Sequence, residues 1–381
     1  MISTTDNHCE TLRVGICGAA RIARKNITAI QNQVSNAKCV AIASRSIEKA
    51  EEFHRTHVLD EWKDTVSIIA GVDAYDKLIE SEDIDAVYIP LPVMVKKEWI
   101  MKALRAKKHV LCEKPVSISA SEYEELLAVA KEAGRYIMDG TMFVHNSRTG
   151  NMLDYVSKEA EFGKVTRINS EFTFRGDEDF FANDIRTAKS GDPYGCIGDL
   201  GWYCVRFAQL VFRKTGCRTV TRAQTTFWTL NDEGVPIDAQ CLVFFSNENA
   251  EKNEERVLSF HCSFVHPLHQ RVDVVGTKHS LEMMDYVIPR EGSGSWCVHG
   301  QELTDNDEYS ARSINRVEVP CGPVQEVLMW RNFSKHCRAV ESRGWQDHDA
   351  NELSAISVQN QKIVDALMKS IAEDGKIVSL H

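Results

Sequence analysis

Short apolar segments alternate with helical segments over the first part of the chain. The apolar, strand-like segments are residues 12–18, 39–44, 85–90, 109–112 and 136–139. Helices are predicted near residues 21–32, 46–55 and 94–107. A fourth helix is predicted to begin after Ser119 or Ser121 as N-cap, to run to Ala133 and to end at Gly134. Strands that alternate with helices of this length predict βαβ units and a parallel sheet.

The pattern changes after about residue 165, where apolar and more polar residues alternate with a period of two. One such series runs from Leu258 to Phe264. Further strand-like segments are residues 219–230, 240–246, 271–275 and 316–319, and two helical segments follow near 323–341 and 349–371. Period-two alternation predicts an antiparallel sheet with one covered face.

The composition is typical of a globular protein with no affinity for polyanions. The 381 residues are 43% hydrophobic and 26% charged, with a formal net charge of −10. At roughly 150 residues per domain this length predicts about two domains, and the negative field disfavours nucleic acid or an anionic membrane as partner. Residues 1–10 lack the apolar core of a secretory signal, and no apolar run reaches the roughly 18 residues of a membrane span. The 12 cysteines contain no Cys-x-x-Cys pair, so we expect reduced thiols and a cytoplasmic or similarly reducing location. The expected partner is a small-molecule substrate.

A nucleotide-binding turn is predicted directly after the first apolar segment. Residues 18–23 read Gly-Ala-Ala-Arg-Ile-Ala, which fits Gly-x-Gly-x-x-Ala with Ala20 at the middle glycine. In this fingerprint the first glycine permits a tight turn and the helix N-terminus faces the pyrophosphate. We therefore expect Gly18, Ala20, Arg21 and Ile22 to contact a dinucleotide, with an ordinary strand–helix turn as the alternative.

The end of the second strand discriminates between the two nicotinamide cofactors. An acidic residue there would bind the ribose 2′-hydroxyl of NAD, but this chain has Ser44, Arg45 and Ser46. Arg45 can pair with a 2′-phosphate and Ser44 can add a donor. NADP(H) is therefore predicted over NAD(H), and a solvated surface arginine is the alternative.

The fourth apolar strand ends in Glu113-Lys114-Pro115. Proline restricts its own backbone and that of the preceding residue, and ligand crevices of open α/β sheets lie at strand ends. We therefore expect Lys114 to act as a cation beside the nucleotide, with Glu113 next to it. Pro90 and Leu91, which follow the third strand, are predicted to border the same crevice.

These motifs together resemble the glucose–fructose oxidoreductase / inositol dehydrogenase (Gfo/Idh/MocA) family over nearly the whole chain. Segments 138–146, 176–180, 183–186 and 198–203 are most similar to a plant-type branch near dimeric dihydrodiol dehydrogenase and NADP-dependent xylose dehydrogenase. The resemblance implies an α/β fold with an N-terminal Rossmann domain at 10–140. It also implies a C-terminal α/β domain at 141–381 with an open, mainly antiparallel sheet. That sheet is implied to form a homodimer or higher homo-oligomer, and the late helices to pack back near the domain junction.

The resemblance also implies three catalytic residues, Lys114, Asp199 and Tyr203. Hydride transfer at a carbon that bears oxygen requires a proton transfer as well, and a tyrosine with an unperturbed pKa of ~10 can supply it if a cation favours its phenolate. Lys114 would provide that charge, and Asp199 would orient Lys114 or a substrate hydroxyl. A core aromatic is the alternative for Tyr203, and an N-cap of a helix at 200–212 is the alternative for Asp199.

Four further residues are candidates for substrate binding. Lys96 stands where the family has a histidine near the nicotinamide, although a lysine reaching solvent is an equal alternative. His145 and Arg148 align with the family's substrate pocket, and Arg186 can clamp a hydroxyl or carboxylate.

The expected activity is hydride transfer to or from the CH–OH carbon of a sugar, polyol or trans-dihydrodiol. A reductase of a C=N or C=C bond, which the departure at Lys96 leaves open, and a non-catalytic NADP(H)-binding regulator are the alternatives. No metal site is predicted, because the acidic run 177–179 lacks further ligands.

Overall fold

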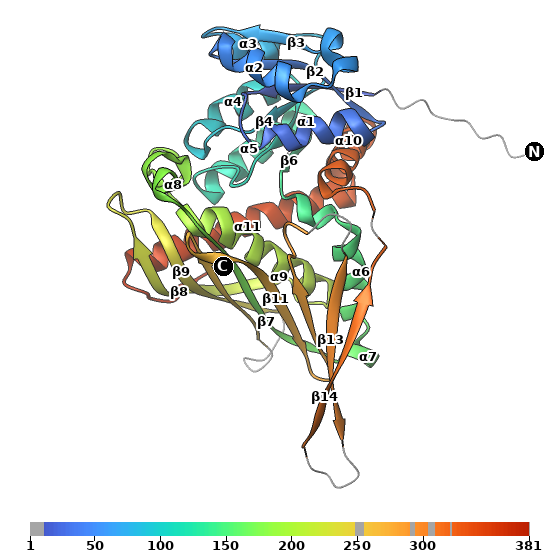
Figure 1. Ribbon diagram of the computed structural model, residues 1–381, viewed down its shortest axis with the longest axis vertical. Coiled ribbons are helices and arrows are strands. Elements are labelled where there is room, and N and C mark those ends of the chain that lie inside the picture. The colour runs from blue at the N-terminus through green and yellow to red at the C-terminus, as the bar shows by residue number, and fades with distance from the viewer. Residues whose placement is uncertain (1–10, 248–254, 290–293, 304–308, 321, 381) are drawn as a thin grey trace, which may run out of the picture.

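The computed structural model describes residues 11–247, 255–289, 294–303, 309–320 and 322–380. The prediction about residues 1–10 lies outside this part of the chain. Two sheets organise the molecule, and helices α9 and α11 lie between them (Figure 1).

The N-terminal sheet has six parallel strands in the order β3-β2-β1-β4-β5-β6, as in a dinucleotide-binding Rossmann fold. Its strands are β1 Leu12–Cys17, β2 Ala37–Ser44, β3 Ser67–Ala70, β4 Ala86–Ile89, β5 His109–Cys112 and β6 Ile137–Asp139. Its helices are α1 Ala23–Gln33, α2 Ile47–His57, α3 Ala74–Glu80, α4 Val93–Arg105 and α5 Ala120–Ala133.

The predicted strands of this sheet are confirmed, but β3 and α3 were missed. β3, with the sequence Ser-Ile-Ile-Ala, is a four-residue edge strand without a fully buried residue, although its sequence is apolar. Helix α5 begins as predicted at Ser119, whose Oγ accepts the Glu122 N–H at 3.1 Å. It ends at Gly134, whose φ of 63° is the left-handed conformation that glycine favours.

The C-terminal sheet has nine strands in the order β14-β13-β12-β11-β7-β10-β9-β8-β15. The strands are β7 Val165–Arg175, β8 Thr219–Leu230, β9 Pro236–Ser246, β10 Arg256–Ser263, β11 Val265–Gly276, β12 Ser280–Met284, β13 Ser295–Leu303, β14 Tyr309–Glu318 and β15 Val378–Ser379. All neighbouring pairs are antiparallel except β7 with β10, which confirms the expected open, mainly antiparallel sheet.

One face of this sheet is covered by helices, as the alternation predicted. The helices of this part are α6 Ser147–Val156, α7 Glu159–Phe162, α8 Glu178–Asn183, α9 Trp202–Lys214, α10 Gln325–Arg343 and α11 His348–Ala372. Val243, Phe245, Leu258 and Phe260 are buried on the inner face, where α9 packs against β7 and β10 and α11 against β8. Helix α10 extends to the Rossmann part and contacts α1.

The predicted thiol chemistry and the absence of a membrane-spanning segment agree with the described residues. Their cysteines are free, and all except Cys297 are buried. Within the same residues, no helix combines the length and apolar character needed to cross a membrane.

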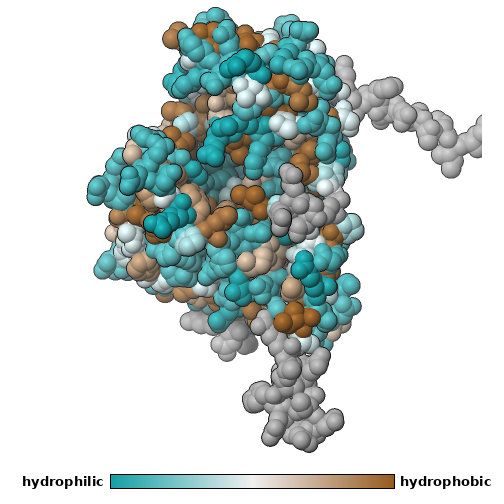
Figure 2. All heavy atoms as spheres, viewed as in Figure 1, coloured by the Kyte–Doolittle hydropathy of each residue, from teal (hydrophilic) through white to brown (hydrophobic). Residues whose placement is uncertain are grey.

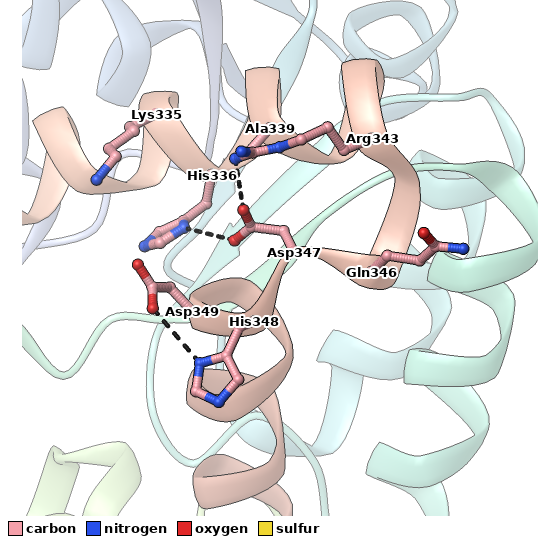
Figure 3. A pocket seen from close by; sticks show the side chains of 8 residues that line it. All are labelled: Lys335, His336, Ala339, Arg343, Gln346, Asp347, His348 and Asp349. Carbon is pink, nitrogen blue, oxygen red and sulfur yellow. Dashed lines mark hydrogen bonds and ion pairs between the residues drawn. The ribbon is translucent and has the colours of Figure 1, made fainter.

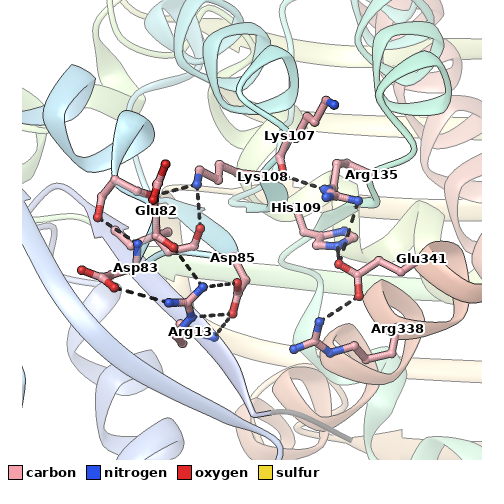
Figure 4. A network of polar contacts seen from close by, with 12 residues as sticks. Arg13, Glu82, Asp83, Asp85, Lys107, Lys108, His109, Arg135, Arg338 and Glu341 are labelled. Carbon is pink, nitrogen blue, oxygen red and sulfur yellow. Dashed lines mark hydrogen bonds and ion pairs between the residues drawn. The ribbon is translucent and has the colours of Figure 1, made fainter.

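A buried histidine joins β5 to helix α10 (Figure 4). His109 Nδ1 accepts the Tyr136 N–H at 2.9 Å, so the proton of the neutral ring is on Nε2, which donates to Glu341 at 3.1 Å. Burial lowers the pKa of His109 despite the neighbouring carboxylate. The hydrogen bond from His109, followed by that from Arg338, holds the pKa of Glu341 down at about 2.

We predict that His109 makes the fold less stable as the pH falls below about 6.5. The unfolded chain protonates this ring near pH 6.5 and the folded chain does not, so the unfolded state binds more protons. In His109→Gln, an uncharged donor for Glu341 remains and the titration is removed. Urea unfolding at pH 7 and pH 5 is expected to give a smaller drop in unfolding free energy for the variant. Equal drops in the two proteins would contradict the assignment.

Candidate active site

The turn after β1 is shaped to approach a ligand closely. Gly18 has a φ of 115°, and a Cβ there would lie 3.2 Å from Leu91, which follows β4. Helix α1 begins at Ala23 without a capping side chain and without an acidic residue in its first turn. Its first amide groups are therefore available for an anion.

The remaining predicted residues of this turn surround the same helix end. Ala20 and Ile22 are half-buried, and Arg21 is exposed. The Ala20 carbonyl accepts the Ala23 N–H at 3.0 Å. The alanine at the middle glycine position thus continues the turn into α1, and the residues fit a dinucleotide pyrophosphate.

Arg45, at the end of β2, is exposed beside this turn. Its side chain interacts with the Tyr75 hydroxyl, which lies 3.4 Å from the position of a Cβ on Gly18. Ser44 is buried, and its Oγ accepts the Ser46 N–H at 3.2 Å. Because Arg45 is exposed, it can pair with an anion from solvent, whereas Ser44 orders the backbone.

Lys114, at the end of β5, forms a buried ion pair with the C-terminal part. Its Nζ lies 2.5 Å from Asp199 Oδ1 and 2.7 Å from the Asp199 carbonyl oxygen, with side-chain exposures of 8% for Lys114 and 14% for Asp199. Asp199 belongs to a π-helical turn, Ile197–Gly201, that leads into α9. The other carboxylate oxygen accepts from Arg186 at 3.1 Å.

The two cations determine the charge of Asp199. Burial alone would raise the pKa of its carboxyl group, but the ammonium of Lys114 and the guanidinium of Arg186 outweigh this effect and lower it. Arg186 is held in turn by Asp184, which it meets with two nitrogens at 2.8 and 2.9 Å. The structure thus brings together Lys114, Asp199 and Arg186, three of the predicted residues.

Tyr203, the first-turn residue of α9, lies under the same ammonium group. Lys114 Nζ is 4.8 Å from the ring centre, and the hydroxyl contacts Met142 Sδ at 3.8 Å. Burial, followed by the carboxylates of Glu113 and Asp199, raises the pKa of the hydroxyl well above its ordinary value. The ammonium faces the ring of Tyr203, and the role of Lys114 in favouring a phenolate stays a prediction.

Glu113 ends a chain of buried hydrogen bonds that begins in helix α10. Trp330 Nε1 donates to Asn26 Oδ1 at 2.8 Å, Asn26 Nδ2 donates to the Tyr88 hydroxyl at 2.8 Å, and this hydroxyl donates to Glu113 at 2.6 Å. Every donor points toward Glu113, so its carboxyl group is the terminal acceptor. A Cβ on Gly140 would lie 3.0 Å from the same carboxylate, so a larger residue there would press on Glu113.

The sequence suggested that Lys96 lies near the nicotinamide or reaches solvent, and the structure shows its side chain bound to backbone carbonyl groups. It is 2% exposed, and its Nζ donates to the carbonyl oxygens of Glu113 at 2.6 Å and Pro115 at 2.7 Å. Burial lowers its pKa. Lys96 therefore holds the backbone on both sides of Lys114, because α4 directs it inward rather than toward a substrate or solvent.

His145 and Arg148 also have structural contacts instead of a place beside Lys114. His145 Nδ1 lies 3.0 Å from the Asn332 side-chain amide, and burial lowers its pKa to about 4. Arg148 is buried and donates to the carbonyl oxygens of Met284 and Asp285. The polar atoms of these two residues are used within the protein, and their predicted substrate contacts stay predictions.

Asp192 was missed by the sequence analysis. It is buried, its Oδ1 accepts the Tyr194 N–H at 3.0 Å, and burial raises its pKa to about 6. The charges of Asp199, Lys114 and Lys96 all act on it. Its only sequence signal is its place in the loop before Asp199, because the burial that perturbs it is tertiary.

The molecule has a hollow between its two parts, visible on the face in Figure 2. A separate cavity of about 720 Å³ lies at the junction of α10 and α11 (Figure 3). Its charged groups pair with one another, Arg343 with Asp347 at 2.6 Å and His348 with Asp349 at 3.6 Å. None of the predicted site residues lines this cavity.

Two family models match this chain. The model described as an oxidoreductase family with an NAD-binding Rossmann fold matches residues 12–141, and a GFO/IDH/MocA C-terminal domain matches residues 154–282. The two matches together cover more than half of the chain.

The chain spans about half the length of the curated relatives that it matches. The dTDP-3,4-didehydro-2,6-dideoxy-alpha-D-glucose 3-reductase of Streptomyces violaceoruber is 37% identical over 207 residues, 54% of this chain and 56% of the relative. The D-xylose 1-dehydrogenase (NADP(+)) 2 of Haloferax volcanii is 33% identical over 199 residues, 51% of this chain and 56% of the relative.

A solved 3-ketoreductase from Actinomadura kijaniata, in complex with NADP and TDP-benzene, has a similar fold. The TM-score is 0.73 at 25% identity, covering 94% of this chain and 98% of the other. Solved variants of that ketoreductase have a tyrosine replaced by phenylalanine and a lysine replaced by alanine or glutamate.

We predict that Asp192→Asn stabilises the protein at pH 8 and does so much less at pH 4.5. The folded-state pKa of about 6 exceeds the ordinary value of 3.8, so the folded protein loses stability as the pH rises through 6. A difference of this size corresponds to at most about 3 kcal/mol. Asparagine keeps the acceptor for the Tyr194 N–H. Thermal unfolding at both pH values measures the effect, and an equal or lower melting temperature at pH 8 would refute it.

Proposed function

The chain belongs to the Gfo/Idh/MocA family of oxidoreductases, and on this premise we propose that it transfers a hydride between NADP(H) and the CH–OH or keto carbon of a sugar. The observation that carries the proposal is the cluster of Lys114, Asp199 and Tyr203 at the end of β5. It joins the Rossmann part, which would hold the cofactor, to the part that would hold the substrate. The Gly18 turn would hold the pyrophosphate of the cofactor, whose nicotinamide would supply or accept the hydride.

Lys114 is suited to bind the substrate oxygen. An ammonium group has three N–H donors, and Asp199 accepts from Lys114 through its carboxylate and its carbonyl oxygen. The third donor is left for an oxygen that gains negative charge as a carbonyl is reduced, a form of electrostatic stabilisation. Asp199 is fixed on its other side by Arg186, so the direction of this donor is predetermined.

Tyr203 would supply the proton. Because the pKa of its hydroxyl is raised, the phenol is protonated at neutral pH and can donate to the alkoxide that hydride addition creates. The lysine and tyrosine substitutions in the solved ketoreductase concern the same two residue types.

NADP(H) is the proposed cofactor. Arg45 is exposed next to the Gly18 turn, and residues 44–46 contain no carboxylate that would repel a 2′-phosphate. The xylose dehydrogenase relative is named as NADP-dependent, and the solved ketoreductase contains NADP. The residues at the end of β2 and the cofactors of the related proteins both support NADP(H).

A sugar is favoured over the other substrates considered. Both relatives act on sugars by name, and Arg186 beside Asp199 offers donors for hydroxyl groups. A C=N or C=C reductase was considered because Lys96 replaces the family's histidine. This argument is weaker in the structure, since Lys96 binds backbone carbonyl oxygens. A regulator without catalysis would not require the buried, mutually fixed Lys114 and Asp199. We further propose a cytoplasmic homodimer formed through the outer face of the nine-stranded sheet.

Replacing Tyr203 by Phe is expected to lower kcat for NADPH-dependent reduction of a keto sugar by about 10²–10⁴, the usual contribution of general acid catalysis. Lys114→Met should lower kcat as well, because it removes the donor to the substrate oxygen. The affinity of Tyr203→Phe for NADPH should not change. Steady-state rates from nicotinamide absorbance and cofactor titration by fluorescence measure the two quantities.

Tyr155→Phe on α6 is the matched control, since it removes a tyrosine hydroxyl outside the cluster. Near-normal turnover in both Tyr203→Phe and Lys114→Met would end the assignment. Absence of turnover with any keto sugar, polyol or dihydrodiol, despite firm NADPH binding, would favour the regulator.

Arg45→Ala is expected to weaken NADPH binding about ten- to hundredfold, the loss of hydrogen bonds to a charged group, and to leave NADH binding unchanged. Arg24→Ala, which removes an exposed arginine of α1, is the control. Fluorescence titration of each variant with both reduced cofactors makes the comparison. An equal loss for NADH and NADPH would show that Arg45 does not bind the 2′-phosphate.

A further inference from the structure

Three neighbouring strands of the C-terminal sheet bring two histidines and a carboxylate together. Asp238 lies on β9, His261 on β10 and His266 on β11. β9 pairs with β10 in a regular antiparallel register, and β11 begins two residues after β10 ends. The three side chains are therefore positioned by strands and a tight connection, which are rigid supports for a site.

The polar atoms of these side chains converge. His261 Nε2 is 2.7 Å from Asp238 Oδ1, and His266 Nδ1 is 3.8 Å from the same oxygen. One ligand atom from each residue lies within 4.8 Å of the others, and no other group of three such side chains was found among the described residues. Asp238 is buried, His261 is half-buried and His266 is exposed, so the three side chains lead from the protein interior to the surface.

We propose that Asp238, His261 and His266 bind one divalent transition-metal ion. Two imidazole nitrogens with one carboxylate oxygen suit Zn²⁺, Fe²⁺, Co²⁺ or Ni²⁺, whereas Ca²⁺ and Mg²⁺ prefer oxygen ligands. Zinc bonds of about 2.0–2.1 Å place tetrahedral ligand atoms about 3.3 Å apart. The distances of 2.7 and 3.8 Å fall on either side of this value, and a rotation of the exposed His266 ring would shorten the longer one.

Two features next to Asp238, His261 and His266 bear on metal binding. Ser263 Oγ lies 2.9 Å from His266 Nδ1 and also accepts the Val265 N–H at 3.1 Å, and a metal ion would replace Ser263 as the partner of this nitrogen. His261 borders a hollow of about 170 Å³ on the outer sheet face, which leaves space for water to complete the coordination. The ion would connect β9, β10 and β11 at a distance from the Lys114 cluster, independently of the proposed oxidoreductase activity.

The experiment uses the full-length chain without a histidine tag, stripped of metal by a chelator. Titration with Co²⁺ should give visible ligand-field absorption that saturates at one ion per chain, and Zn²⁺ should abolish it. Metal analysis after gel filtration should find one zinc per chain. His261→Ala and His266→Ala are each expected to weaken Co²⁺ binding at least about tenfold, since even the loss of a group that orients a ligand costs 10–100-fold.

His269→Ala is the matched control, because His269 is a second histidine of β11, half-buried, that pairs with a carboxylate, Glu171, at 2.6 Å. Its Co²⁺ affinity should equal that of the wild type. Circular dichroism checks that each variant is folded, and His266 is exposed enough for its replacement to be tolerated. Equal Co²⁺ affinity in the wild type and His261→Ala, or a thiolate-to-cobalt charge-transfer band, would overturn the proposal.

Discussion

The ion pair between Lys114 and Asp199 is the contact on which the rest of the site depends. It connects the end of a Rossmann strand to the turn that begins α9, two segments that come from different sheets. Burying two charges gains little net stability, but removal of one partner leaves the other unpaired and typically costs about 3–5 kcal/mol. The pair therefore acts mainly on geometry, since it forces an ammonium, a carboxylate and the ring of Tyr203 into one place.

The Glu-Lys-Pro turn that carries this lysine is fixed from two sides. Lys96 binds the carbonyl oxygens before and after Lys114, and the chain from Trp330 to Glu113 fixes the preceding side chain. Both supports are buried, so water cannot compete for them. Trp330 belongs to α10, far from Glu113 in sequence, which shows that the C-terminal helix contributes to the site without touching a reacting group.

The features that could be predicted are those that local sequence determines. Alternating apolar strands, the glycine turn and the Ser119 and Gly134 caps depend on neighbouring residues, and the structure has them where the pattern placed them. The orientations of Lys96, His145 and Arg148 could not be predicted, because a motif fixes the position of a residue and not which way its side chain points. Asp192 was missed for a related reason, since its perturbed pKa arises from burial by distant segments.

The charges around Tyr203 act differently on its ring and on its hydroxyl group. An ammonium over the face of an aromatic ring is attracted to the ring itself, and it stabilises a phenolate less than it would beside the oxygen. The carboxylates of Glu113 and Asp199 act on the hydroxyl in the opposite sense and, with burial, keep its proton bound. Asp199 therefore has two effects, because it holds Lys114 in place and helps to raise the pKa of the Tyr203 hydroxyl. A keto group placed between Lys114 and Tyr203 would meet two proton-bearing groups, which is the arrangement that reduction requires.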